Sequence, residues 1–469
     1  MKTRIEHDLL GNKEVPAEAY YGVQTLRAIE NFENISGIKL GSYPNYIKAL
    51  AMVKHAAAVA NHDLGLLTDE VCEAICKACN EIVDGKFHDE FPVDMIQGGA
   101  GTSTNMNANE VIANRALELM GYEKGQYEYC HPNNHVNLSQ STNDAYPTGI
   151  KLALIYMNQE LVADLKVLID AFRAKGKEFK DVIKMGRTQL QDAVPMTLGQ
   201  EFEAYAANLE EEIDRLNQMA KLFLEINMGA TAIGTGINSE PEYSAKCVKA
   251  LVDVSGEPFV LAGNLIEATP DTGSYVIYSS ALKRMAVKIS KICNDLRLMS
   301  SGPRCGFGEI NLPPMQPGSS IMPGKVNPVI PEVMNQICFR VIGNDLTVTF
   351  AAEAGQLELN VMEPVIVHAI FGSIKMMQKG FSVLRELCVN GITANEGRCR
   401  DMVMNSIGIV TALNPTLGYE ASSRVAKRAL AENRSVYDLV LEEKLLTKDE
   451  LDELLRPENM IQPKKFYKK

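Results

Sequence analysis

Residues 278–299 read YSSALKRMAVKISKICNDLRLM, and their apolar side chains recur in alternating steps of four and three. This repeat places those side chains on one face of a helix for three heptads. Two further segments, 154–172 and 198–216, keep nearly the same spacing, and residues 330–357 and 361–387 are long and compatible with helices. We therefore predict an all-α protein built around a long central five-helix bundle.

The bundle divides the chain into three predicted domains. Residues 1–143 form an N-terminal domain of shorter helices and loops, residues 144–393 contain the long helices, and residues 394–469 form a small C-terminal helical domain. We expect the basic end at 464–469 to be a solvated terminus. Strand-like alternation is scarce and a βαβ pattern is absent, which argues against a nucleotide-binding sheet.

The composition excludes several classes of protein. The chain has 469 residues, with 47 Lys and Arg against 59 Asp and Glu, and a net charge of −12. This acidic balance argues against a nucleic-acid or anionic-membrane partner. No uncharged apolar run is long enough to cross a bilayer, and the start of the chain lacks the apolar core of a signal peptide. We expect a cytoplasmic protein whose ten cysteines stay reduced.

Two patterns suggest cofactor sites but have simpler explanations. Cys72, Cys76 and Cys79 have the spacing of iron–sulfur ligands, but this spacing also marks one helix face and no turn residues separate them. The glycine-rich segment 98–109 lacks the Lys-Ser/Thr ending of a phosphate loop and follows no clear strand. The seven histidines include no metal-binding H-E-x-x-H pattern. We expect no catalytic metal and no required cofactor, and activation by a divalent ion stays open.

Four segments concentrate hydroxyl and amide side chains, at 98–109, 139–144, 186–192 and 318–328. Each lies beside a long or expected helix. A turn or a helix cap explains any single one of them, but four together favour a binding surface, because hydroxyls and amides at helix N-termini bind anions. The last segment, GSSIMPGKVNP, has the glycines and prolines of a shaped loop. Its polar side chains are Ser319, Ser320, Lys325 and Asn327.

These segments carry a resemblance to a known family. Residues 318–328 resemble the signature loop of the aspartase/fumarase superfamily. Residues 98–111, 139–144 and 185–195 resemble its other substrate-binding regions, in the same order along the chain. Within the superfamily, the first two of these regions are most similar to the aspartate ammonia-lyase branch. Class II fumarases tend to have serine at the position of Thr142.

The resemblance implies a three-domain helical subunit that assembles into a homotetramer with a shared helical core, each active site drawing on three chains. It also implies reversible deamination of L-aspartate to fumarate and ammonia. If each residue has the role of its counterpart in the family, Ser319 is the general base. As a stabilised alkoxide, it removes the Cβ proton to give an enediolate. The other implied residues bind substrate: Thr102, Ser141, Thr142, Asn143, Thr188, Gln189, Ser320, Lys325 and Asn327.

Gln189 departs from the pattern of many superfamily members, which carry histidine at this position. A glutamine cannot shuttle protons near neutral pH, so the implied chemistry must not depend on an imidazole there. The departure counts against a class II fumarase, which is one alternative. The others are a lyase that releases fumarate from a larger adduct such as argininosuccinate, and a non-catalytic structural relative. Intact Ser319, Lys325 and Asn327 argue against the last.

Overall fold

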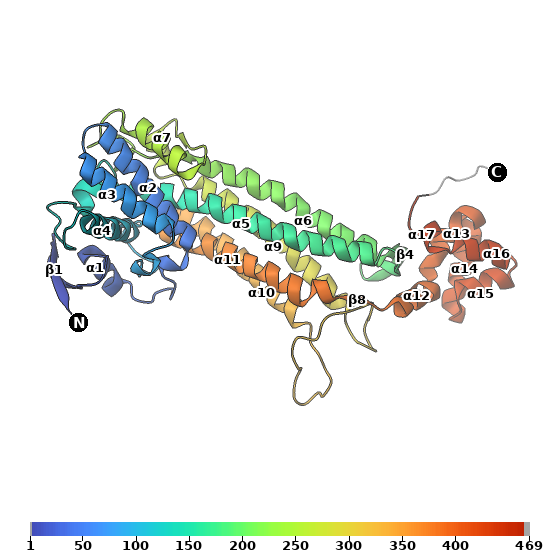
Figure 1. The fold of residues 1–469 in the computed structure, drawn as a ribbon. Helices are drawn as coiled ribbons and strands as arrows, with labels where there is room; N and C mark the ends of the chain where they lie inside the picture. Colours follow the sequence, from blue (N-terminus) through green and yellow to red (C-terminus); the bar gives the residue numbers. More distant parts are fainter. Residues whose placement is uncertain (1, 464–469) are drawn as a thin grey trace. The chain divides into compact units, whose positions relative to one another are not determined.

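The computed structural model describes residues 2–463, so the basic end of the predicted C-terminal domain lies outside the described residues. Helices dominate this part of the chain, and its four sheets have only two short strands each (Figure 1). The prediction of an all-α fold class is confirmed. The five predicted long segments are the five longest helices of the described chain: α5 (Thr142–Glu178), α6 (Leu198–Ala220), α9 (Gly273–Met299), α10 (Val329–Glu353) and α11 (Glu363–Leu387).

The heptad spacing of α9 correctly identifies its buried face. Every apolar residue of the seam is at most 4% exposed. Burial of such a stripe is the main source of stability for a helix in a folded protein. The seam consists of Tyr278, Leu282, Met285, Ile289, Ile292, Leu296 and Met299.

The chain divides into two compact units, and each is assembled from three separate stretches. The first unit comprises the chain up to Val162, Asp214–Arg284 and Phe339–Met377. The second comprises Ala163–Ile213, Met285–Cys338 and the chain from Gln378 onward. Parts of all five long helices occur in both units. The three-domain division expected from the sequence stays a prediction.

In the first unit, polar side chains join the long helices to one another. The Tyr278 hydroxyl of α9 donates to Asn158 of α5 at 3.0 Å, and Asn158 donates to Asn217 of α6 at 3.1 Å. Ser279 of α9 donates to Asp345 of α10 at 2.9 Å. The remaining elements of this unit are β1 (Thr3–Asp8), β2 (Gly11–Pro16), α1 (Val23–Asn31), η1 (Leu40–Ser42), α2 (Pro44–Asp63), α3 (Asp69–Val83), η2 (His88–Glu90), α4 (Thr102–Leu119), η3 (Pro132–Val136), η4 (Lys221–Leu224), β5 (Glu225–Ile226), α7 (Tyr243–Ser255), β6 (Val260–Leu261) and α8 (Leu265–Ala268).

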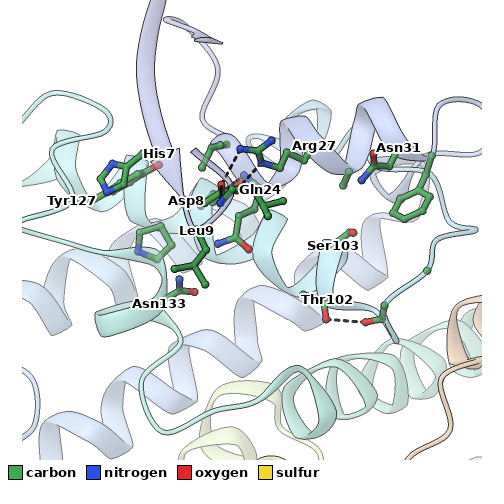
Figure 2. Close-up of a pocket in the computed structure, with 18 of the residues that line it drawn as sticks. His7, Asp8, Leu9, Gln24, Arg27, Asn31, Thr102, Ser103, Tyr127 and Asn133 are labelled. Carbon is green, nitrogen blue, oxygen red and sulfur yellow. Dashed lines mark hydrogen bonds and ion pairs between the residues drawn. The ribbon is translucent and has the colours of Figure 1, made fainter. Parts of the chain in front are cut away.

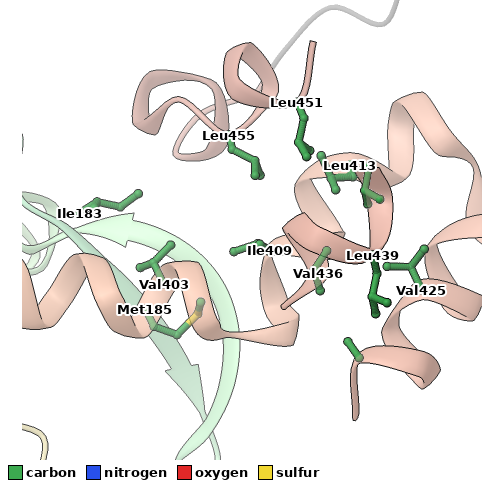
Figure 3. Packing of buried hydrophobic residues seen from close by; sticks show 12 residues of the cluster. Ile183, Met185, Val403, Ile409, Leu413, Val425, Val436, Leu439, Leu451 and Leu455 are labelled. Atoms are coloured by element: carbon green, nitrogen blue, oxygen red, sulfur yellow. The ribbon is translucent and has the colours of Figure 1, made fainter. Parts of the chain in front are cut away.

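The second unit ends in a set of short helices with its own apolar core. This core includes Val403 of α12 and Ile183 of β3, together with Leu439 of α15 (Figure 3). The elements of this unit besides the long helices are β3 (Ile183–Thr188), β4 (Gln191–Thr197), β7 (Ile310–Asn311), η5 (Val389–Gly391), β8 (Thr393–Ala394), α12 (Glu396–Asn405), η6 (Ile407–Ile409), α13 (Val410–Leu417), α14 (Tyr419–Glu432), α15 (Val436–Glu442), α16 (Lys448–Leu454) and α17 (Pro457–Met460).

The hydroxyl and amide segment at 186–192, for which the sequence predicts no strands, lies in the antiparallel hairpin of β3 and β4. The hairpin turn is made by Gln189 and Leu190, which both have positive φ, 54° and 59°. Neither residue is the glycine or asparagine that usually occupies such a turn.

Among the described residues, no helix has the length and apolar character required to span a membrane.

Candidate active site

The N-terminus of α5 presents three of the predicted binding residues side by side. Ser141 caps this helix, because its Oγ accepts the backbone N–H of Asn143 at 3.2 Å. In return, the Asp144 carboxylate accepts the backbone N–H of Ser141 at 2.9 Å. This reciprocal cap fixes where the helix begins. Ser141, Thr142 and Asn143 are therefore held together on the first turn, each half-buried.

Hydrogen bonds from other elements hold Thr142 and Asn143 in place. The Thr142 hydroxyl accepts from the Asn105 amide of α4 at 3.2 Å. The Asn143 amide donates to the Ala232 carbonyl at 2.7 Å, and the Asn143 carbonyl accepts from Asn227 at 3.0 Å. The first turns of α4 and α5 are thus connected through Asn105. The helix dipole at such a turn favours a bound anion.

Asp144 is a structural carboxylate beneath this turn. It is fully buried, and besides Ser141 it accepts the backbone N–H groups of Gly229 at 3.1 Å and Thr231 at 2.9 Å. Burial raises the pKa of Asp144 to about 6, while these hydrogen bonds act in the opposite direction. Its oxygens are occupied by the backbone, so it holds the segment around 229–231 against the start of α5.

Lys54 of α2 is a functional candidate that the sequence did not reveal. It is fully buried, and its ammonium donates to the amide oxygens of Asn105 at 2.6 Å, Gln140 at 2.8 Å and Asn137 at 2.9 Å. Burial lowers the pKa of Lys54 to about 7. Asn105 and Gln140 stand in segments that the sequence marked as polar. Lys54 stands in an alanine-rich helix that also contains Lys48, so a lysine there gave no distinguishing signal.

A cavity of about 1030 Å³ opens beside the N-terminus of α4 in the first unit, and Thr102 and Ser103 line it (Figure 2). Thr102 is exposed, and its hydroxyl donates to the Gly99 carbonyl at 2.7 Å. Arg27 and Asp8 form an ion pair on the cavity wall at 2.7 Å. The Arg27 guanidinium lowers the pKa of the Asp8 carboxyl.

The hairpin of β3 and β4 carries two more predicted residues, Thr188 and Gln189, both exposed at its tip. Its base is anchored by charge. Arg187 pairs with the fully buried Glu309 at 2.6 Å, and Lys184 approaches the other oxygen of Glu309 at 3.4 Å. Buried charges persist when they are paired in this way. These ion pairs fix the base of the hairpin, while the side chains at its tip are exposed.

The signature loop is exposed and closes on itself through its backbone. The Met322 N–H donates to the Ser319 carbonyl at 3.0 Å, and the Lys325 N–H donates to the Met322 carbonyl at 3.1 Å. Gly318 allows the two ends to meet, since a Cβ there would lie 2.1 Å from the Lys325 carbonyl oxygen. Within residues 2–463, the Ser319 hydroxyl and the Lys325 ammonium have no hydrogen-bond partner. Both groups are free to meet a ligand.

The predicted site residues fall into two sets. Thr102, Ser141, Thr142 and Asn143 belong to the first compact unit. Thr188, Gln189, Ser319, Ser320, Lys325 and Asn327 belong to the second. Each set combines hydroxyl and amide side chains with a lysine, Lys54 in the first unit and Lys325 in the second. Among the described residues, neither set contains a cluster of side chains that could hold a metal ion.

The cysteine cluster agrees with the helical interpretation. Cys72, Cys76 and Cys79 lie on α3, with Cys72 and Cys79 buried and the Cys72 and Cys76 sulfurs 4.0 Å apart. In the part of the chain that the structure describes, no group of three or more His, Cys, Asp or Glu side chains is arranged to hold a metal ion.

Comparisons with known proteins identify the family of the chain. A family model described as "Lyase" matches residues 11–343, and one described as "Fumarase C C-terminus" matches residues 409–462. The chain is 61% identical over 465 residues to an aspartate ammonia-lyase of Helicobacter pylori strain J99, covering 99% of both. It is 62% identical over 463 residues to one of Pseudomonas aeruginosa, covering 98% of both. Against the Escherichia coli K12 enzyme of that name, identity is 57% over 461 residues, 98% of this chain and 96% of the other.

Solved structures of related proteins also match nearly the whole chain. A Brucella melitensis protein titled fumarate lyase:delta crystallin, bound to cobalt, has a TM-score of 0.95 and 54% identity, covering 98% of this chain and all of that one. A class II fumarase from Schistosoma mansoni has a TM-score of 0.90 and 34% identity, with 97% and 98% coverage. The helical fold, the family models and the full-length relatives all lead to one conclusion: this chain belongs to the aspartase/fumarase superfamily of lyases.

Proposed function

We propose that this chain is an aspartate ammonia-lyase, a carbon–nitrogen lyase that converts L-aspartate reversibly into fumarate and ammonia. The observation that carries the proposal is identity of 57–62% to aspartate ammonia-lyases over at least 98% of the chain. Identity to the class II fumarase is much lower, at 34%. Gln189 supports the same choice, because a glutamine cannot take part in proton transfer during hydration.

The chemical difficulty is removal of a weakly acidic Cβ proton. It becomes acidic enough only if the neighbouring carboxylate accepts a second negative charge as an enediolate. Preorganised donors aimed at this charge supply much of the rate in such reactions. In our proposal Ser319 removes the proton as an alkoxide, while Lys325 and the N–H groups of the loop stabilise negative charge.

The remaining predicted residues would bind the two carboxylates and the amino group. Thr142 and Thr188 provide hydroxyl donors, and Thr102 would do so in place of its bond to the Gly99 carbonyl. The helix dipole at the first turn of α5 favours the negative charge. We assign Ser141 and Ser320 as further carboxylate donors. Asn143 would lie beside the amino group, Asn327 would hold the loop or the substrate, and Gln189 would donate or accept a hydrogen bond.

We further propose that the enzyme is a cytoplasmic homotetramer that needs no cofactor. An apolar stripe on α10 supports self-association: Phe339, Leu346 and Phe350 are 61%, 56% and 66% exposed at spacings of seven and four. Exposed stripes of this kind mark interaction surfaces. A tetramer would also allow residues from different chains to complete each site. Activation by a divalent ion is a separate question, which an assay with and without added Mg²⁺ answers.

Replacement of the proposed base tests the mechanism. Ser319→Ala should lower turnover by more than the roughly 10²–10³ typical of losing one oxyanion donor, because it removes the proton acceptor itself. Formation of fumarate from aspartate is followed by its ultraviolet absorbance. Ser423→Ala, on α14, serves as the control and should retain full activity. Near-normal turnover of Ser319→Ala would exclude Ser319 as the base.

The product distinguishes this function from its rival. Incubation with fumarate and ammonium should give aspartate, whereas a fumarase would give malate whether or not ammonium is present. A chain that gives neither product while binding dicarboxylates would be a non-catalytic relative.

A further inference from the structure

Lys54 carries a buried charge that neutral groups surround. Its side chain is fully buried, and its three ammonium hydrogens are matched by three amide oxygens, those of Asn105, Asn137 and Gln140. No carboxylate of the described chain forms an ion pair with it. Buried charges are normally paired with opposite ones. The positive potential of this ammonium is therefore not cancelled by direct contact.

The amide groups around the Lys54 ammonium also determine how the Thr142 hydroxyl is oriented. An ammonium can only donate, so the oxygen of the Asn105 amide must face Lys54 and its nitrogen must face away. That nitrogen donates to Thr142 Oγ1 at 3.2 Å and to Asn137 Oδ1 at 3.1 Å. Because Thr142 Oγ1 accepts this bond, its own hydrogen is directed to another acceptor. Thr142 is thereby prepared to donate.

The titratable groups that act on Lys54 are Asp144, Cys79 and Cys247. Asp144 is engaged by three backbone N–H groups rather than by the ammonium. Burial raises the pKa of Cys79 and of Cys247, to about 12 for the latter, so both thiols are neutral at ordinary pH. Asp144 is the one group here that offsets the charge of Lys54, and it does so from a distance.

We propose that Lys54 is a positioning residue for the dicarboxylate, orienting the Thr142 hydroxyl through Asn105 and attracting the substrate's negative charge to the first turn of α5. This inference rests on the proposed function. If Lys54 had only a structural role, cancelling its charge while keeping its packing would leave the affinity for the dicarboxylate unchanged. If it positions the substrate, the same change would weaken binding.

Asn137→Asp provides that change. The substitution keeps the acceptors for Lys54 and Asn105 and gives Lys54 a carboxylate partner, while the contact between Asn105 and Thr142 stays intact. The bond from the Asn137 amide to the Gln140 carbonyl, at 3.2 Å, is lost, and a carboxylate oxygen then faces that carbonyl oxygen. The new ion pair with Lys54 offsets this cost. Lys54→Met removes the charge and the donors together. Lys175→Met is the control, because Lys175 is also buried and donates to the Ile392 carbonyl, although it is ion-paired with Glu178 at 2.8 Å.

Succinate, an unreactive dicarboxylate, is the probe, and calorimetry on the full-length protein gives its Kd. We expect Asn137→Asp to raise the succinate Kd at least tenfold with an unchanged or higher melting temperature. Lys54→Met should raise it further, and the Lys175→Met control should lower only the melting temperature. A succinate Kd within twofold of wild type in Asn137→Asp would overturn the charge role of Lys54. Failure of the wild type itself to bind succinate would instead overturn the proposed function, and this inference with it.

Discussion

Two glycines at opposite ends of α4 have the same backbone conformation and different surroundings. Gly101 and Gly121 both have a φ of +87°, in the region that glycine occupies most easily. A Cβ at Gly101 would lie 2.6 Å from the Tyr146 ring, whereas nothing lies within 4 Å of one at Gly121. The pair separates the cost of backbone strain from the cost of a steric clash.

Gly101→Ala should therefore destabilise the protein more than Gly121→Ala. Both substitutions incur backbone strain of about 1–3 kcal/mol, and only the first must also move a buried aromatic ring. Because Thr102 directly follows Gly101, the same change should raise the KM for aspartate. Thermal unfolding and steady-state kinetics of both variants measure this, and equal melting temperatures would show that the ring yields without cost.

Lys54 gives a pH-dependent prediction. Its pKa of about 7 means that about nine-tenths of the free protein has a neutral Lys54 at pH 8. A bound dianion favours the protonated form, so succinate binding should take up close to one proton at pH 8 and about half a proton at pH 7. Asp144, with a pKa of about 6, stays ionised at pH 8. Calorimetry in HEPES and in Tris buffer gives the number of protons, which should fall to zero in Lys54→Met.

The sequence singles out side chains that lie on recognisable motifs, and it does not single out a polar side chain that is buried away from any motif. Ser319 and Thr142 stand in segments whose clustered hydroxyls already indicated a site. Lys54 stands among alanines and valine, where a lysine usually points to solvent. Only the fold brings Asn105, Asn137 and Gln140 around it, from positions 51 to 86 residues away, and no local pattern contains that information.

At the level of elements, helices were predictable because their signal is local. The steps of four and three in α9 follow from the helical repeat, and the hydroxyl segment at the start of α5 contains the Ser141 and Asp144 that cap it. The β3–β4 hairpin gave no such signal. Its turn needs two residues with positive φ, and Gln189 and Leu190 are poor choices for that conformation.

The strain in that turn predicts a stabilising substitution. Leu190 is 65% exposed, so Leu190→Gly removes little packing while relieving an unfavourable backbone conformation. We expect the free energy of unfolding to rise by about 0.5–1 kcal/mol. Val194→Gly, at an extended position of β4, is the control and should lower it. Urea denaturation compares the two, and a loss of stability in Leu190→Gly would mean that its side chain is packed in the assembled protein.

At the scale of the whole molecule, the proposed site residues belong to both compact units, and in our proposal neither set alone makes a complete catalytic centre. One set has the helix N-termini and Lys54, and the other has the loop with Ser319 and Lys325. Sequence periodicity indicated long helices but not which of their faces would meet another chain in the proposed tetramer. The exposed stripe on α10 becomes visible only when the fold shows which apolar residues the subunit leaves uncovered.

This stripe gives the last prediction, on assembly. Phe350→Glu places a charge in the proposed interface, where burying an unpaired carboxylate is strongly unfavourable. We expect the tetramer to dissociate, as measured by light scattering after gel filtration, and aspartate turnover to fall with it, because residues from separate chains would no longer meet. Leu430→Glu is the control, since Leu430 is 74% exposed on α14, outside the stripe. A Phe350→Glu variant that stays tetrameric and active would place the interface elsewhere. One that dissociates but keeps full turnover would mean that a single chain completes its own site.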